Sequence, residues 1–300
     1  MKKKIKILVL GGTGFIGYHL LKRSLKKNYK CDSISKSKPK KKRKLKNVRY
    51  LICNIKNKNL LKKKLDNYYD YIVNLSGYVD HTKNQEIERI HFHGCKNLVE
   101  IFKKKNLKSF VQIGSGLEYG DLHSPHKETF KCRPKTNYSI SKLKAVKYLE
   151  RSYKKFNFPF TALRLYQAYG PKQDVNRLIP YIIKSCLQNK EFPCTSGTQL
   201  RDFLYIDDMI DLIFNVFTNE KSRGKIFNVG SGKKMSVKKL ILSIVKITKK
   251  GRPGFNKIKM RKDENNKMYP DISKVKRLLK WHPKTCLEKG LIKTVNFYKK

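Results

Sequence analysis

One stretch near the N-terminus decides the fold: Lys4-Ile5-Lys6-Ile7-Leu8-Val9-Leu10-Gly11-Gly12-Thr13-Gly14-Phe15-Ile16-Gly17. The apolar run predicts a buried strand, and the helical pattern from Tyr18 predicts a helix directly after the glycines. Strand, glycine loop and helix in this order are the context that a dinucleotide-binding site requires. Gly11 permits the tight turn, Gly14 lets the backbone approach a pyrophosphate, and Gly17 allows close packing of helix on strand. The alternative is a tight turn without a ligand.

Further apolar runs alternate with helical patterns along the chain. Strands are expected at 29–35, 48–55, 71–77 and 110–115, and a long amphipathic helix at 88–103. This alternation predicts an α/β fold with a Rossmann-like, doubly wound parallel sheet. We expect a dinucleotide-binding domain at 1–175 and a smaller substrate-binding domain at 176–300. Some interleaving is expected, because about residues 200–230 can return to the first domain.

The end of the second expected strand bears on the cofactor. An acidic residue there commonly holds the ribose 2′-hydroxyl of NAD, but this chain has Ser35 followed by Lys36. A small hydroxyl and a cation suit the 2′-phosphate of NADP. NAD is the alternative, with Asp32 as the acid if the strand ends earlier. The residues expected at the cofactor, besides the catalytic ones named below, are Gly11, Thr13, Gly14, Phe15, Ile16, Gly17, Ser35, Lys36, Asn54, Ile55, Leu75 and Ser76.

The formal net charge of +49 raises the question of a nucleic-acid or membrane partner. The lysines are spread along the whole chain, and Asn, Ile, Tyr and Phe are also plentiful, as AT-rich coding DNA would produce. No specific nucleic-acid partner is therefore expected, although the charge would steer anionic substrates toward the protein. The basic run 36–44 is interpreted as a solvated loop beside the adenosine end of the cofactor, rather than as a nuclear-localisation or nucleic-acid patch.

Apolar stretches and cysteines indicate the compartment. No stretch approaches ~20 uncharged apolar residues, so no membrane span is expected, and the first apolar run stops too early for a signal peptide. The seven cysteines are scattered, with no Cys-x-x-Cys pair. This pattern predicts reduced, mostly buried thiols, no metal site and a cytoplasmic protein.

Tyr138 and Lys142 are four residues apart, so a helix would place both on one face. An ammonium near a phenol favours the phenolate, which predicts a lowered tyrosine pKa. Such a tyrosine can give or take a proton during hydride chemistry. The same spacing also arises by chance in a chain with 17 Tyr and an excess of Lys, so its meaning depends on the glycine loop upstream.

The chain resembles the extended short-chain dehydrogenases/reductases, the NAD-dependent epimerase/dehydratase family that acts on nucleotide sugars. The matching segments stand in the family's order and cover nearly the whole chain: 11–17, 115–120, Tyr138 with Lys142, 164–171, 201–208, 261–263, 271–274 and 280–283. The resemblance implies that Ser115 hydrogen-bonds the sugar oxygen at C4 and that Tyr138 is the general acid/base. It implies that Lys142 binds the nicotinamide ribose and lowers the tyrosine pKa.

Substrate contacts follow from the same resemblance. Gln167 stands where the family usually has Asn, and Arg201 and Arg261 are implied as ligands of the substrate diphosphate, a task that suits a planar bidentate donor. Surface ion pairs are the alternative for both arginines. The family also implies a homodimer.

Departures from the family pattern narrow the reaction. Family dehydratases carry an Asp-Glu pair directly after the catalytic hydroxyl, whereas this chain has Gly116 and Leu117, so dehydration is not expected. Glu118 comes one position later, and on an extended segment it would point the other way. His91 replaces a usual Asn, and a role in helix packing or behind the cofactor is favoured over catalysis.

The stretches 176–183 and 194–203 resemble CDP-abequose synthases, which reduce a 4-keto group on a CDP-dideoxyhexose with NADPH. We therefore expect an enzyme that reduces a 4-keto deoxysugar on a nucleoside diphosphate. The alternative is a C4 epimerase that retains its NAD. A nucleic-acid-binding Rossmann protein is a third class, and the intact set of Ser115, Tyr138 and Lys142 argues against it.

Overall fold

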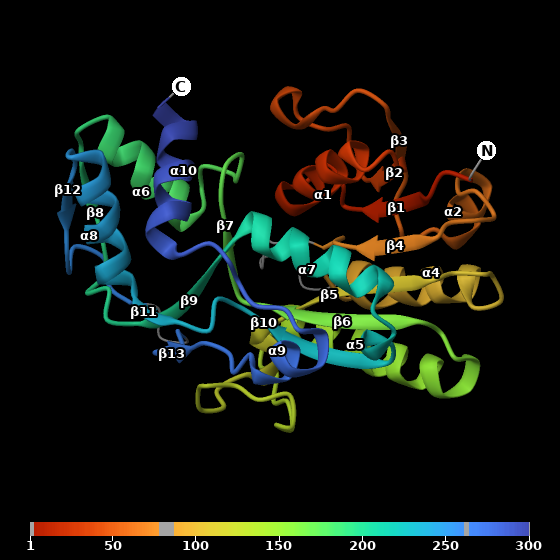
Figure 1. Ribbon diagram of the computed structural model, residues 1–300. Helices are drawn as coiled ribbons and strands as arrows, with labels where there is room; N and C mark the ends of the chain where they lie inside the picture. The colour runs from red at the N-terminus through yellow and green to blue at the C-terminus, as the bar shows by residue number, and fades with distance from the viewer. Residues whose placement is uncertain (1–2, 78–86, 261–263, 300) are drawn as a thin grey trace.

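The computed structural model describes residues 3–77, 87–260 and 264–299. Its centre is a seven-stranded sheet with the order β10-β6-β5-β4-β1-β2-β3, in which every neighbouring pair is parallel (Figure 1). This sheet confirms the predicted Rossmann-like α/β fold. The strands are β1 (Lys6–Leu10), β2 (Lys30–Ser35), β3 (Val48–Ile52), β4 (Tyr71–Asn74), β5 (Ser109–Ser115), β6 (Phe160–Leu165) and β10 (Lys225–Val229).

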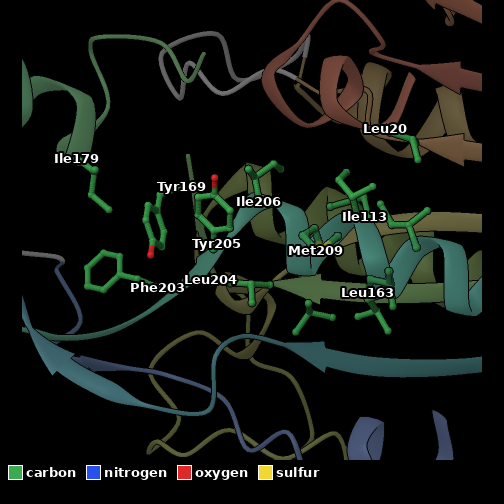
Figure 2. Close-up of a cluster of buried hydrophobic side chains, with 14 of the residues drawn as sticks. Leu20, Ile113, Leu163, Tyr169, Ile179, Phe203, Leu204, Tyr205, Ile206 and Met209 are labelled. Atoms are coloured by element: carbon green, nitrogen blue, oxygen red, sulfur yellow. The ribbon is translucent and has the colours of Figure 1, made fainter. Parts of the chain in front are cut away.

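Helices cover both faces of this sheet. Side chains alternate along each strand, so both faces of the sheet present apolar residues that the helices bury. Ile7 and Val9 belong to one apolar cluster, which includes residues of α1 (Phe15–Lys26) and α7 (Ile206–Thr218). Leu8 and Leu10 belong to the other, opposite helices α2 (Lys58–Lys64), α4 (Gly94–Phe102) and α5 (Asn137–Phe156). Figure 2 shows part of the first cluster, which continues from α7 into the smaller part of the molecule.

The smaller part of the molecule lies beyond the carboxyl ends of the large sheet (Figure 1). Its β9 pairs with three other short strands, and a separate two-stranded sheet lies beside them. After β9 the chain returns, since α7 packs on the large sheet and β10 is its edge strand. The division into domains at residue 175 stays a prediction. The remaining elements are β7 (Gln167–Tyr169), α6 (Leu178–Leu187), β8 (Glu191–Pro193), β9 (Leu200–Tyr205), η4 (Glu220–Ser222), β11 (Lys234–Ser236), α8 (Val237–Thr248), β12 (Arg252–Gly254), β13 (Lys267–Met268), α9 (Ser273–Leu279) and α10 (Leu287–Lys299).

The helix expected at 88–103 is not regular. A π-helical turn, η2 (Arg89–His93), precedes α4. Gly94 stands at the junction, where a Cβ atom would lie 2.3 Å from Cδ1 of Ile55. The helix thus passes close to Ile55, in the segment that follows β3. Such π turns are frequent near functional sites.

The basic run 36–44 is not wholly solvated, which corrects the interpretation from sequence. Arg43, in the short 3-10 helix η1 (Lys41–Arg43), is only 3% exposed. Its Nη2 donates to the carbonyl of Lys172 at 2.6 Å and lies 2.9 Å from the carboxylate of Asp174. Arg43 therefore holds the basic loop against the segment that leads from β7 to α6.

The described cysteines form no disulfide, and five of them are buried: Cys31, Cys53, Cys95, Cys186 and Cys194. Within the described ranges, no cluster of His, Cys, Asp or Glu could hold a metal ion. Over the same ranges, the helices are all too short or too polar to cross a membrane.

The glycine loop yields a prediction about stability. A Cβ atom at Gly17 would lie 2.5 Å from both the Gly11 oxygen and the Gly12 Cα, which are backbone atoms. Gly17→Ala should therefore lower the free energy of unfolding by about 1–3 kcal/mol, as overpacking typically does. Urea denaturation followed by circular dichroism measures this change.

Gly14→Ala is the matched control. Gly14 has an ordinary φ of −80°, and its Cβ would meet only the Gly11 oxygen, at 3.2 Å. The alanine at position 14 should cost clearly less stability than the alanine at position 17. Equal losses would show that α1 does not depend on close packing at Gly17.

Candidate functional site

Two clefts adjoin at the carboxyl ends of the parallel strands, where open α/β sheets bind their ligands. One, of about 510 Å³, lies at the ends of β1, β2 and β4. The other, of about 730 Å³, lies among β7, α6, β9 and the segment that precedes β13. Gln167, Ala168, Gln173 and Arg177 line both clefts.

The smaller cleft brings together the residues predicted at the cofactor. It lies where the strand order reverses between β1 and β4, the position at which doubly wound sheets bind dinucleotides. Apart from Tyr138 and Lys142, every residue of that prediction lines it, namely Gly11, Thr13, Gly14, Phe15, Ile16, Gly17, Ser35, Lys36, Asn54, Ile55, Leu75 and Ser76.

The lining of this cleft fits a dinucleotide. Gly14 is the N-cap of α1 and has no side chain that could cap the helix. The first backbone amides of the helix can therefore donate hydrogen bonds to a bound anion. Its φ suits any residue, so the backbone conformation does not require a glycine here, and the missing side chain leaves room for a ligand to approach the backbone. The hydroxyl oxygen of Ser35 is buried and has no hydrogen-bond partner among the described residues, and Ser35 lines the cleft.

Asp32 does not take the acidic role that the NAD alternative required. β2 extends to Ser35, so Asp32 lies in the middle of the strand and is 4% exposed. Its carboxylate accepts hydrogen bonds from Arg49 Nε at 2.9 Å and from the Tyr69 hydroxyl at 2.7 Å. The end of the second strand therefore presents no carboxylate.

The structure brings Ser115, Tyr138 and Lys142 together. Ser115 ends β5, and the other two lie in the first turns of α5. The Lys142 ammonium is buried and donates to the Ile113 carbonyl at 2.8 Å, which ties α5 to β5. The Ser115 and Tyr138 side chains share a hydrogen bond. These residues line neither cleft themselves, but Leu117 lines the larger one, and Leu165, which pairs with Ser115 in the sheet, lines the smaller one.

The predicted lowering of the tyrosine pKa is wrong for the protein without ligands. Burial raises the pKa of Tyr138 to about 12, while the hydrogen bond with Ser115 and the charge of Arg177 act in the opposite direction. Burial also lowers the pKa of Lys142 to about 8. Both pKa shifts arise because removal from water disfavours the charged form of each group. The Lys142 ammonium donates its hydrogen bond to the Ile113 carbonyl.

His91 lies against this set. Its ring, 2% exposed, meets the Tyr138 ring edge to face with centroids 5.1 Å apart. A Cβ atom at Gly77 would lie 2.0 Å from His91 Cε1, so the glycine leaves room for the imidazole. These contacts fit the packing role favoured from sequence.

The predicted substrate residues lie at the larger cleft as far as the structure describes them. Gln167 lines both clefts, and Arg201 lines the larger one, with its Nη2 2.8 Å from the Glu264 carboxylate. Arg261 lies outside the described residues. Sequence reasoning missed Glu264 and Arg177. Arg177 entered the sequence analysis only as part of the stretch 176–183 that resembles CDP-abequose synthases.

Glu118 is placed differently from the expectation. The segment is not extended but forms a 3-10 helix, η3 (Gly116–Tyr119), which turns the Glu118 side chain inward. The carboxylate is fully buried, accepts from the Ser115 amide at 2.8 Å and from Arg164 Nε at 2.7 Å. The side chain that faces the larger cleft at this turn is Leu117.

Comparisons with known proteins agree with this geometry. A sequence profile of the NAD dependent epimerase/dehydratase family matches residues 7–230. The chain is 26% identical to the dTDP-D-glucose 4,6-dehydratase of Mus musculus over 318 aligned positions, which cover 98% of this chain and 89% of the relative.

Two solved structures are similar over 98% of this chain and 99% of their own. The UDP-glucose 4-epimerase of Thermotoga maritima, solved with UDP-glucose, superposes with a TM-score of 0.93 at 25% identity. The UDP-glucuronic acid 4-epimerase of Bacillus cereus, solved with UDP-glucuronic acid and NAD, superposes with a TM-score of 0.87 at 26% identity. Similar proteins thus include a dehydratase and epimerases.

The buried ammonium yields a prediction about pH. Between pH 8 and 10.5 the unfolded chain binds the Lys142 proton that the folded protein has lost, so this residue makes stability rise with pH. Lys142→Met removes that contribution. The stability of the natural protein relative to the variant should rise by up to about 3 kcal/mol across this window, since one unit is worth about 1.4 kcal/mol. Urea unfolding at several pH values measures it, and a constant difference would contradict the assignment.

Proposed function

Because the chain belongs to the NAD-dependent epimerase/dehydratase family, we propose that it catalyses hydride transfer at C4 of a sugar attached to a nucleoside diphosphate, as the NADPH-dependent reduction of a 4-keto deoxysugar. One observation carries this proposal. The hydrogen-bonded pair of Ser115 and Tyr138 lies beside the junction of the two clefts. Leu117, which lines the larger cleft, stands where the dehydratases of the family carry an acidic residue.

The smaller cleft would hold the dinucleotide along the glycine loop, and the larger one the nucleotide sugar. A bound nicotinamide supplies or accepts the hydride. Tyr138 gives its phenolic proton to the C4 oxygen, Ser115 holds that oxygen by a hydrogen bond, and Lys142 orients the ribose. Arg177 lines both clefts, and its charge favours the tyrosinate left after proton transfer.

Dehydration is not supported even though the mouse relative is named a dehydratase. Elimination of water requires a further acid and base beside the reacting sugar. In the part of the chain that the structure describes, the carboxylates lining the two clefts are Asp174 and Glu264, and each is paired with an arginine. Glu118 faces away from the clefts, into the pair with Arg164.

The residues at the end of β2, Ser35 and Lys36, favour reduction by NADPH over epimerisation with retained NAD. The Ser35 hydroxyl lacks a partner among the described residues, Lys36 follows it, and both line the cofactor cleft. A hydroxyl and an ammonium suit the 2′-phosphate of NADPH, a reductant that is consumed. The resemblance of stretches 176–183 and 194–203 to CDP-abequose synthases supports the same reaction.

C4 epimerisation with retained NAD is the second candidate. The likeness to the Thermotoga maritima epimerase over nearly the whole of both chains favours it. Both reactions would use the same proton transfer by Tyr138. They differ in whether the cofactor leaves after one hydride transfer or returns the hydride to the other face of the sugar.

Several further features belong to the proposal. Arg201 and Arg261 would bind the substrate diphosphate, with residues 176–300 as the main substrate-binding part. We also propose a cytoplasmic homodimer with no specific nucleic-acid partner. The charge of +49 would instead favour encounters with anionic nucleotide sugars.

Incubation under anaerobic conditions tests the reaction. Purified protein is mixed with NADPH and CDP-, dTDP- or UDP-linked 4-keto-deoxysugars, and mass spectrometry identifies products and any copurified dinucleotide. The expected result is one NADPH oxidised for each keto sugar reduced. Interconversion of two C4 hydroxy sugars without NADPH oxidation would establish the epimerase instead.

Tyr138→Phe tests the proton donor. The kcat should fall by about 10²–10⁴, the typical contribution of general acid–base catalysis, while dinucleotide binding persists. Tyr153→Phe, on the same helix but at neither cleft, is the matched control and should retain activity. Comparable kcat values for the Tyr138 variant and the natural protein would exclude this tyrosine as the acid.

Ser35→Asp tests the cofactor assignment. A carboxylate at the end of β2 would repel the 2′-phosphate and accept the ribose 2′-hydroxyl of NADH. The ratio of kcat/KM for NADPH over NADH should therefore fall by about 10–100-fold, equivalent to roughly 1.4–2.8 kcal/mol. An unchanged ratio would mean that Ser35 does not contact the adenosine ribose.

A further inference from the structure

Glu118 and Arg164 form a buried ion pair directly behind the catalytic serine. Their side chains are 0% and 3% exposed, and Arg164 Nε donates to the carboxylate at 2.7 Å. A buried pair of this kind is weak evidence for stability, because removing both charges from water offsets much of their attraction. Its place in the fold therefore calls for another explanation.

The second carboxylate oxygen of Glu118 connects the ion pair to the catalytic serine. Glu118 Oε1 accepts from the Ser115 amide, while Ser115 Oγ accepts from the Leu117 amide at 3.2 Å. Together these bonds form a capping box at the start of η3. Because the serine oxygen accepts from the backbone, its single proton is left to be donated toward Tyr138 or a sugar oxygen.

The surroundings hold the carboxylate in one place. A Cβ atom at Gly114 would lie 2.5 Å from Glu118 Oε1, so the glycine makes room for it. Arg164 also donates to the Tyr119 hydroxyl at 2.9 Å, and that hydroxyl donates to Asn228 at 2.8 Å. A satisfied network in a dry environment is rigid.

The charge of Glu118 also reaches the other catalytic groups. It acts on both Tyr138 and Lys142 and raises the pKa of each, opposing the effect of burial at Lys142. The other ionisable groups around them are Arg177 and His91 near the tyrosine and Cys95 near the lysine. Among these groups, Glu118 is the one that carries a carboxylate, so it supplies the negative charge near Tyr138 and Lys142.

We propose that Glu118 is a positioning residue for the hydride-transfer reaction. Its bonds to the Ser115 amide and Arg164 orient the serine hydroxyl as a donor to the reacting oxygen, and its negative charge keeps the neighbouring Lys142 ammonium in a buried site. This inference rests on the proposed function. It gives the acid after Ser115 a role inside the protein, in contrast to the substrate-facing acids of family dehydratases.

Two variants test the proposal. Glu118→Gln keeps the shape and an acceptor for the Ser115 amide but leaves Arg164 without its counter-charge, and it can fail to fold. The double variant Glu118→Gln/Arg164→Met removes both charges and should restore the melting temperature. We expect the folded double variant to lose kcat by about 10²-fold, as for a misplaced catalytic group, with KM within about twofold.

The pH profile distinguishes positioning from a purely structural role. The carboxylate raises the pKa of Lys142, and loss of the Lys142 proton would set the alkaline limb of kcat, so removal of the carboxylate should move that limb to lower pH. Glu128→Gln is the matched control, because Glu128 accepts from the Asn228 amide at 2.8 Å in the same region without contacting Ser115. Its profile should equal that of the natural protein. A folded double variant with natural kcat and profile would overturn the proposal, as would an equal shift in the Glu128 variant.

A readout without turnover separates this inference from the proposed function. In the double variant the side chain at position 118 has lost its charge and its bond to Arg164, so it accepts more weakly from the Ser115 amide. Amide hydrogen exchange of the peptide containing Ser115 should therefore accelerate in the double variant and not in Glu128→Gln. If the natural protein reduces no keto sugar and the exchange still accelerates, the proposed reaction fails while the positioning of Ser115 stands. Unchanged exchange in the double variant would overturn the positioning role in either case.

Discussion

The hydrogen bond from the Lys142 ammonium to the Ile113 carbonyl is the contact on which the candidate site depends. It joins the first turns of α5 to the last residues of β5, so that Tyr138 meets Ser115. A buried ammonium is costly unless it is hydrogen-bonded and electrically compensated. The carbonyl provides the first condition, and the charge of Glu118 behind Ser115 contributes to the second. The serine, the tyrosine and the lysine are thus held by one set of interactions, which spans a strand end, a 3-10 turn and a helix start.

The order of the sheet explains why this set lies beside two clefts. Parallel strands place all their carboxyl ends on one edge, and the reversal between β1 and β4 opens that edge for a dinucleotide. β6 then leads through β7 into the smaller part of the molecule, and α7 and β10 return. Because the chain crosses between the two parts at residues of the cleft junction, Gln167 and Arg177 contact both clefts. Arg43 adds a further link between the basic loop and the segment before α6.

Features that depend on local sequence could be predicted, and features that depend on burial could not. The glycine loop, the strand that ends at Ser35 and the shared face of Tyr138 and Lys142 are set by short-range spacing, and the structure has them as expected. The tyrosine pKa was predicted with the wrong sign because the sequence does not show how much water the fold removes. Arg43 seemed solvated because its partners are more than a hundred residues away. Glu118 was misplaced by the assumption of an extended segment, although Ser115-x-x-Glu118 has the spacing of a capping box.

The distribution of carboxylates bears on the meaning of the extreme charge. With 71 Lys and Arg against 22 Asp and Glu, acids are scarce, yet several of them are fully or almost fully buried. Asp202 accepts from the amides of Ser231 and Gly232, and Asp208 accepts from those of Lys284 and Thr285. Glu118 accepts from the amide of Ser115 in the same way. These acids satisfy backbone donors that a lysine cannot satisfy, whereas an exposed position accepts lysine at little cost. A coding bias toward lysine would therefore replace residues at exposed positions and retain the acids at such buried positions. This is the distribution seen here. It requires no nucleic-acid partner.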